Sequence, residues 1–209
     1  KMAYYDLDKE QRHLLSEKIQ SDIEKDINCK RNVPLLAYAA DEDTYIRKAT
    51  YLAIGRIYKK IPGKKALIIE LLTDLLQNKN EKIRQTSINA AGEIGMQHFE
   101  KVATLMHAGL FDAHHCVRNA VIGSIKKMGD KNPEPVLAFA RKYLHHPDKE
   151  IRREICHGIE LRGRTHPQDI LPLLKELEWD KTARVRNTLV HVLGQIAYKK
   201  NCLKTVLEH

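Results

Sequence analysis

The sequence lacks the long apolar run that a membrane-spanning helix needs. No stretch approaches about 18 uninterrupted apolar residues, and residues 1–10 lack the apolar core of a signal peptide. Aromatic residues make up only 6% of the 209 residues and runs of β-branched residues are few, so we expect almost no strand. These absences predict a soluble, cytoplasmic protein with no membrane partner.

The sequence also lacks paired cysteines. No Cys-x-x-Cys spacing links its four cysteines, which are Cys29, Cys116, Cys156 and Cys202. We therefore expect reduced thiols in a helical core. His114 and His115 stand beside Cys116, but no second cluster has the spacing of metal ligands. Solvated loop residues are the better interpretation, and neither a metal nor a cofactor is expected.

Helix-forming and basic residues are abundant. Leu, Ile, Ala, Lys, Glu and Arg dominate and 43% of the residues are apolar, which is typical of helices packed by aliphatic side chains. Lysine and arginine outnumber aspartate and glutamate by 36 to 27, which gives a formal net charge of +9. This excess favours a polyanionic partner such as nucleic acid.

Five segments of the sequence align with one another. They cover residues 43–57, 80–94, 114–128, 148–162 and 182–196, with the sequences DTYIRKATYLAIGRI, NEKIRQTSINAAGEI, HHCVRNAVIGSIKKM, DKEIRREICHGIELR and TARVRNTLVHVLGQI. Each contains one arginine at the same place, and we call these the anchor arginines: Arg47, Arg84, Arg118, Arg152 and Arg186. The intervals between them are 37, 34, 34 and 34 residues, a regularity that predicts a repeat protein.

A second helical pattern precedes each segment. Apolar residues recur every three or four positions in residues 33–40, 66–76, 102–111, 135–144 and 170–179. Helix-breaking or acidic residues mark the turns: Pro62-Gly63, Gly129 with Pro133, and Gly163 with Pro167 between pairs, and Asp41, Asp112, Asp148 and Asp180 within pairs. Each repeat is therefore predicted to be an antiparallel pair of helices, and a leading helix is predicted over residues 6–28.

This pattern resembles HEAT repeats, which are armadillo-like helix pairs whose second helix opens with an acidic turn followed by Val-Arg or Ile-Arg. The resemblance implies an all-α fold, a right-handed α-α superhelix (solenoid) of about five helix pairs. We expect an N-terminal capping helix in residues 1–30, one repeat domain in residues 31–206 and the remnant of a purification tag in residues 207–209. The anchor arginines are expected to bond to carboxylates or carbonyls of the next repeat, a structural role.

Second helices are expected to line the concave side of such a solenoid. Residues one, five and eight places after each anchor arginine then point roughly the same way. We call the basic, amide and histidine members of this set the polar stripe: Lys48, Gln85, Asn89, Asn119, Lys126, Arg153, His157, Asn187 and His191. They predict a ligand-binding groove, with a merely solvated face as the alternative.

Basic residues also gather where the second helices end. We call this group the basic edge: Arg56, Lys59, Lys60, Lys127, Arg162, Arg164, Lys199 and Lys200. The helix dipole alone explains any one of them. Together, however, a ridge spaced by the repeat could follow a phosphate backbone. Aromatic platforms for unstacked bases are scarce, which favours duplex over single-stranded nucleic acid.

The last repeats resemble the bacterial DNA alkylation repair glycosylases, which are built from HEAT-like repeats. The resemblance covers residues 151–200 and is carried by Arg152-Arg153, Gly158, Arg162, the run 172–174, Val185-Arg186, Leu193 and Ile196. It implies a cationic concave groove for duplex DNA. The catalytic pattern of that family is absent, because Trp179 is the only tryptophan and residues 193–196 lack its acidic residue. Glu154 and Glu160 are the nearest carboxylates, and no catalytic residue is assigned.

Three functions follow from these observations. The first is a non-catalytic solenoid that binds nucleic acid, most plausibly duplex DNA in repair. The second is a protein–protein interaction scaffold. An exposed apolar patch in the groove, in place of positive charge, would favour this function. The third is a glycosylase acting on alkylated bases. We expect a monomer in each case.

Overall fold

The computed structural model describes residues 3–29 and 31–209. Residues 1, 2 and 30, which belong to the predicted capping segment, lie outside the described residues. The described chain is helical throughout and contains no strand, as the sequence predicts. None of its helices combines the length and apolar character needed to cross a bilayer.

The chain divides into two compact units. The first comprises residues 1–94 and 104–120, and the second comprises residues 95–103 and 121–209. The helix α5 (Glu81–Leu110) and the helix α6 (His115–Lys131) contribute residues to both.

The first unit begins with a short turn, η1 (Tyr4–Asp6), and the leading helix α1 (Lys9–Cys29). Next come α2 (Val33–Ala39), α3 (Thr44–Lys60), the turn η2 (Pro62–Lys64) and α4 (Lys65–Leu76). In α1, Ile19, Ile23 and Ile27 recur every fourth residue and are all buried, because α1 packs against α2 and α3. Burying each such side chain contributes about 1.5–3 kcal/mol.

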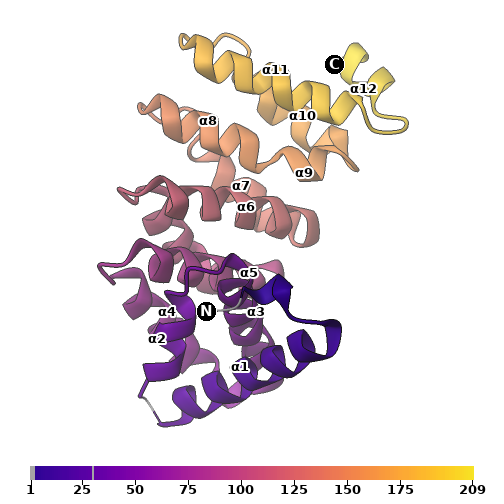
Figure 1. Ribbon diagram of the computed structural model, residues 1–209. Helices are drawn as coiled ribbons and strands as arrows, with labels where there is room; N and C mark the ends of the chain where they lie inside the picture. Colours follow the sequence, from indigo (N-terminus) through magenta and orange to yellow (C-terminus); the bar gives the residue numbers. More distant parts are fainter. Residues whose placement is uncertain (1–2, 30) are drawn as a thin grey trace. The chain divides into compact units, whose positions relative to one another are not determined.

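The second unit contains α7 (Pro133–Arg141), α8 (Lys149–Gly158), α9 (Glu160–Gly163), α10 (Pro167–Lys175), α11 (Ala183–Ala197) and α12 (Leu203–Glu208). Prolines occupy the first turns of α7 and α10, where a helix does not need the missing N–H. In Figure 1, α8 and α11 run side by side, and they pack against each other. Ile155 of α8 and Val192 of α11 are fully buried.

One predicted boundary is confirmed and another differs from the structure. The patterns at residues 80–94 and 102–111 predict separate helices. The label α5 covers both, but the backbone at His98 is not helical (φ −134°, ψ 58°), and a kink there separates the two helices. The segment 148–162, in contrast, is divided into α8 and α9 at Ile159, directly after Gly158.

The cysteine prediction is correct in part. Cys156 and Cys202 are buried, as expected of thiols in a helical core. The prediction is wrong for Cys29, which is exposed because it lies at the last residue of α1, past the buried face of that helix.

The turns inside the helix pairs share one hydrogen-bond pattern. The first turn residue accepts a hydrogen bond, at 2.8–3.1 Å, from the backbone N–H two residues later. The residues in this position are Asp41, Asn78, Asp112, His146 and Asp180. These are side-chain turns of the kind that aspartate and asparagine favour, and they set the chain direction before each second helix.

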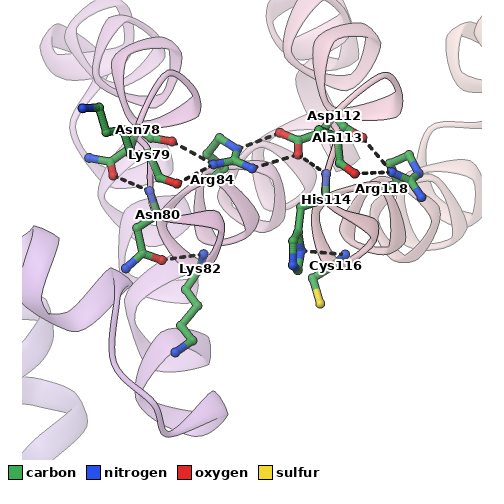
Figure 2. Close-up of polar contacts among 10 residues, drawn as sticks. All are labelled: Asn78, Lys79, Asn80, Lys82, Arg84, Asp112, Ala113, His114, Cys116 and Arg118. Atoms are coloured by element: carbon green, nitrogen blue, oxygen red, sulfur yellow. Dashed lines mark hydrogen bonds and ion pairs between the residues drawn. The ribbon is translucent and has the colours of Figure 1, made fainter.

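The anchor arginines complete these turns. The Nη1 atom of every anchor arginine donates to the carbonyl oxygen of the first turn residue, at 2.5–2.9 Å. Figure 2 shows two consecutive turns of the first unit, where Arg84 also donates through Nε and Nη2 to both carboxylate oxygens of Asp112, at 2.7 and 3.0 Å. Arg84 thereby joins its own turn to the turn of the next repeat.

The second unit contains the same arrangement, which we call the clamp: an anchor arginine bonded to both carboxylate oxygens of the aspartate in the next turn. Arg152 donates to both carboxylate oxygens of Asp180, at 2.5 and 3.0 Å. The predicted bonding to carboxylates of the next repeat is therefore confirmed for Arg84 and Arg152. The carbonyls that they bind, in contrast, belong to their own turn, because the side chain folds back over the first turn of its helix.

Candidate functional site

The polar stripe of the first unit is dispersed. Lys48 on α3 and Asn119 on α6 are exposed, whereas Gln85 and Asn89 on α5 are half-buried. The amide of Gln85 donates to the carbonyl oxygen of Cys116 at 3.3 Å, which accounts for part of its hydrogen bonding within the protein. In the described part of this unit, the three hollows around Leu71, Ile46 and Gln20 are lined by none of these four residues.

In the second unit the stripe lines a hollow, which we call the polar hollow. Arg153 and His157 of α8 and Asn187 and His191 of α11 face it, together with two residues outside the predicted stripe, Arg184 and Thr188. The hollow has a volume of about 310 Å³. None of the six residues that line it has an acidic or a purely hydrocarbon side chain. The aromatic rings in the lining are the imidazoles of the two histidines.

One carboxylate at the rim of the polar hollow holds both arginines. Oε2 of Glu150 accepts from Nε of Arg153 at 2.9 Å, and Oε1 of the same residue lies 3.2 Å from Nη1 of Arg184. Arg153 also lies 3.6 Å from Glu154, which is almost fully buried. Each guanidinium keeps further N–H groups, since arginine has five donors in a planar fork. The pair is therefore oriented and still able to bind an oxyanion.

A buried carboxylate organises the floor beneath these residues. Glu160 is 1% exposed and accepts from Lys126 at 3.2 Å and from Arg164, while Arg164 also donates to Gln195 at 3.0 Å. Burial alone would raise the pKa of Glu160, but the hydrogen bonds from Arg164 and Lys126 outweigh it and lower this pKa. Glu160 is thus an ionised structural group. Its position eight residues after Arg152 predicts that Glu160 lies in the groove beside the polar stripe. In the structure it is instead buried, with Lys126 and Arg164 as its partners.

The contacts of His157 determine its tautomer. Nε2 of His157 lies 3.2 Å from Nζ of Lys126, and an ammonium group can only donate. Nε2 must therefore accept, which leaves the proton on Nδ1, 3.1 Å from Oε2 of Glu160 and at an angle too bent for a full hydrogen bond. Burial, and then the neighbouring Lys126 charge, lower the pKa of His157.

The basic edge is partly neutralised by ion pairs. Arg162 donates to Asp169 at 2.8 Å, and Arg164 is held by Glu160. Nζ of Lys199 lies 5.8 Å from the ring centre of Tyr198. The remaining members are exposed on α3, α6 and the segment after α11: Arg56, Lys59, Lys60, Lys127 and Lys200.

Two groups in the described part of the chain have atoms suited to a metal ion. One is His114, His115 and Cys116, and the other is His157, Glu160 and His191, each with potential ligand atoms within 4.8 Å of one another. In the second group, Lys126 and Arg164 already occupy the oxygens of Glu160, so a divalent cation would have to displace two positive charges. An anion fits the surroundings of this group better than a cation.

Arg184 and Glu150 were not predicted from the sequence, because neither lies one, five or eight places after an anchor arginine. Arg184 precedes Asn187 by three residues and Glu150 precedes Arg153 by three, which is one helical turn in each case. A search for charged residues one turn before each stripe residue would have found both.

Comparison with known proteins identifies the fold class. No protein-family profile and no curated protein matches the chain. Crescerin, which uses a TOG domain array to regulate microtubules in the primary cilium, matches with a TM-score of 0.53 and 19% identity, over 83% of this chain and 81% of that chain. A HEAT-like repeats protein from the archaeon Thermococcus onnurineus NA1 matches with a TM-score of 0.45 and 16% identity, over 94% and 85% of the two chains. A designed armadillo repeat protein matches with a TM-score of 0.38 and 19% identity, over 90% and 94%.

These similarities concern the fold alone. The chain has the all-α superhelical repeat fold of the HEAT and armadillo type, as the repeat pattern of the sequence predicts.

Proposed function

We propose that this repeat protein binds nucleic acid without catalysing a reaction, and that duplex DNA contacts the second unit at the polar hollow. The observation that carries the proposal is the lining of this hollow by Arg153, Arg184, two histidines and two uncharged hydrogen-bonding residues. Arginine binds phosphate through paired N–H groups, and asparagine and threonine side chains also contact the phosphate and sugar of nucleic acids. The net charge of +9 favours the same partner.

The polar character of the hollow favours a backbone contact over readout of unstacked bases. Single-strand sites use aromatic platforms on which bases stack. The strongly exposed aromatic residues of this unit, Trp179 and Tyr198, do not line the polar hollow. A duplex should therefore bind at least as well as a single strand of the same length.

The test is a fluorescence anisotropy titration of a labelled 20-base-pair duplex at several salt concentrations. It compares the wild type with Arg153→Gln/Arg184→Gln and with Lys142→Gln, an exposed lysine outside the hollow. The double variant should bind more weakly, and its slope of log K against log salt should be smaller by about 1.8, since each lost phosphate contact removes about 0.9. Absence of binding at low salt, or wild-type behaviour of the double variant, would refute the proposal.

A base-release assay tests the non-catalytic part of the proposal. Glu154 and Glu160 are 2% and 1% exposed and face cations, so neither is available as a general base. Incubation with alkylated duplex DNA should release no free base above background. Release that is lost in Glu160→Gln would favour the glycosylase alternative.

A second candidate function, a protein-interaction scaffold, is favoured by a different hollow of the second unit. Leu171, Leu174, Leu189, Leu193 and Val206 line it, with a volume of about 210 Å³. Such a hollow suits the apolar face of a partner helix. Selection of displayed peptides on the wild type, with counter-selection on Leu193→Asp, should enrich amphipathic helices if this function is correct. Peptides that bind both proteins equally would exclude it.

A further inference from the structure

The fixed charges around the polar hollow nearly cancel. Arg153 and Arg184 share Glu150, and Arg153 also faces Glu154. Beneath them, Glu160 faces two cations from its own and a neighbouring helix. The hollow therefore has little permanent excess of positive charge, and an anion entering it would be attracted weakly unless another group becomes charged.

The two histidines are the groups able to supply that charge. His157 and His191 both line the hollow, and their ring centres are 5.7 Å apart. Histidine is the side chain whose charge changes near neutral pH. A phosphate or sulfate group placed in the hollow would lie within a few ångströms of both rings and would stabilise their protonated forms.

Protonation of His157 also rearranges its surroundings. A proton on Nε2 would remove the acceptor for Lys126 and would place two cations 3.2 Å apart. In the empty hollow this repulsion opposes protonation. A bound anion offsets the repulsion, since it can accept hydrogen bonds from both the imidazolium and the displaced ammonium group.

In the described part of the second unit, the charged groups around these histidines come from four helices. They are Lys126 on α6, Glu150, Arg153 and Glu154 on α8, Glu160 with the adjoining Arg164 at α9, and Arg184 on α11, beside the uncharged Asn187, Thr188 and Gln195. Each acidic member already has a cationic partner. Among the groups facing the hollow, therefore, the histidines are the ones that can change its charge near neutral pH.

We infer that the polar hollow is a proton-linked phosphate site: Arg153 and Arg184 bind a phosphate group, and its uptake is coupled to protonation of His157 and His191. The inference rests on the proposed nucleic-acid function for its natural ligand, a backbone phosphate, and adds the regulation of that site. Binding tightens as the pH falls and weakens as it rises, because the bound state holds more protons than the free state.

Sulfate is the probe for the first arm of the test, since it does not titrate near neutral pH. Its affinity is measured by calorimetry from pH 7.5 to 5.5 in buffers of different ionisation enthalpy, which also counts the protons taken up. An opposite charge nearby shifts a pKa by about 1–3 units, so the affinity of the wild type should rise about tenfold or more. An affinity that does not change with pH would overturn the inference.

Variants identify the groups responsible. In the double variant His157→Gln/His191→Gln, the affinity for sulfate should not depend on pH. In His191→Gln, at an exposed position, the pH dependence of the affinity should become smaller while the fold is unchanged. His13→Gln, at an exposed histidine of α1, is the matched control and should behave as the wild type. Glu150→Gln should bind more tightly at every pH with the same proton uptake, because it removes a fixed negative charge. A double histidine variant that retains the wild-type pH dependence would contradict the assignment.

The second arm repeats the pH series with a short DNA duplex and with a free nucleoside monophosphate. Proton-linked binding of the duplex supports both the inference and the proposed function. Proton-linked binding of sulfate and the monophosphate without duplex binding supports the inference with a small phosphate ligand, and refutes the proposed function. Duplex binding that is independent of pH supports the function and overturns the inference.

Discussion

Arg152 and Asp180 are joined by two hydrogen bonds although 28 residues separate them, and both side chains are only 7% exposed. Arg152 also holds the carbonyl oxygen of His146, so one guanidinium connects consecutive turns of the second unit. A pair buried to this degree is strongly sensitive to the loss of one partner, because the remaining charge stays in a poorly solvated place.

Replacement of Arg152 by methionine should therefore destabilise the protein by about 3–5 kcal/mol. The matched control is Arg186→Met, since Arg186 is exposed and its recorded contact is one carbonyl oxygen. The control should cost about 1 kcal/mol or less. Urea unfolding monitored by circular dichroism measures both, and equal losses in the two variants would show that the clamp contributes nothing specific.

Stability should also fall in acid as these carboxylates protonate. The hydrogen bond from Arg152 lowers the pKa of Asp180. At Asp112 burial alone would raise the pKa, but the hydrogen bonds from Arg84 and from the backbone N–H of His114, with the charges of these two residues, together lower it. A lowered folded-state pKa means that the unfolded chain binds protons first as the pH falls. The stabilisation is complete above about pH 4 and is lost as the pH falls through the folded-state values. Urea midpoints at pH 7 and pH 3 should differ less in Asp180→Asn than in the wild type.

Two glycines of the second unit should respond in opposite directions to alanine. A Cβ atom on Gly163 would lie 2.5 Å from Cδ1 of the buried Ile196, so Gly163→Ala should cost about 1–3 kcal/mol through overpacking. Nothing lies within 4 Å of a Cβ at Gly194, which is inside α11. Gly194→Ala should stabilise by up to about 1 kcal/mol. Thermal melts of the two variants test the difference in sign.

The cysteines should differ in reactivity. Burial, and then the nearby Glu160 charge, raise the pKa of Cys156 to about 12, so its reactive thiolate is scarce at neutral pH. Cys29 is exposed. Iodoacetamide followed by mass spectrometry should label Cys29 in the native protein and Cys156 only after unfolding. Native labelling of both at similar rates would mean that the core around Cys156 opens readily.

The fold was largely predictable because its two signals are local. Apolar residues every three or four positions specify helices, and the regular interval between anchor arginines specifies the repeat. The break between the helices of residues 80–94 and 102–111 was predicted from periodicity, but its position at His98 was not, because no proline marks it. Bonding of the anchor arginines to carboxylates of the next repeat was predicted, but the pairing of Arg84 with Asp112 and of Arg152 with Asp180 needed coordinates, as did the turn hydrogen bonds of the two aspartates.

The candidate site was predictable in part. Helical periodicity placed Arg153 and His157 on one face and Asn187 and His191 on another, and the structure brings the two faces to one hollow. The pair of Arg164 with Glu160 has the i,i+4 spacing of a helix and could have been read from the sequence, whereas the pair of Arg162 with Asp169 joins α9 to α10 and needed coordinates. The role of the polar stripe in ligand binding stays a prediction.

The clamp between successive turns also constrains the number of residues between its arginine and its aspartate. It spans the same number of residues from Arg84 to Asp112 as from Arg152 to Asp180, so a residue inserted within either interval would carry the aspartate out of reach. The first repeat has a longer interval of 37 residues, which includes the turn η2, and the turn that follows it begins with Asn78. Arg47 bonds to Asp41, Glu42 and Thr44 of its own turn. A repeat can therefore form the clamp where it keeps the interval of 34 residues and is followed by a turn with aspartate in the first position, as the repeats of Arg84 and Arg152 are.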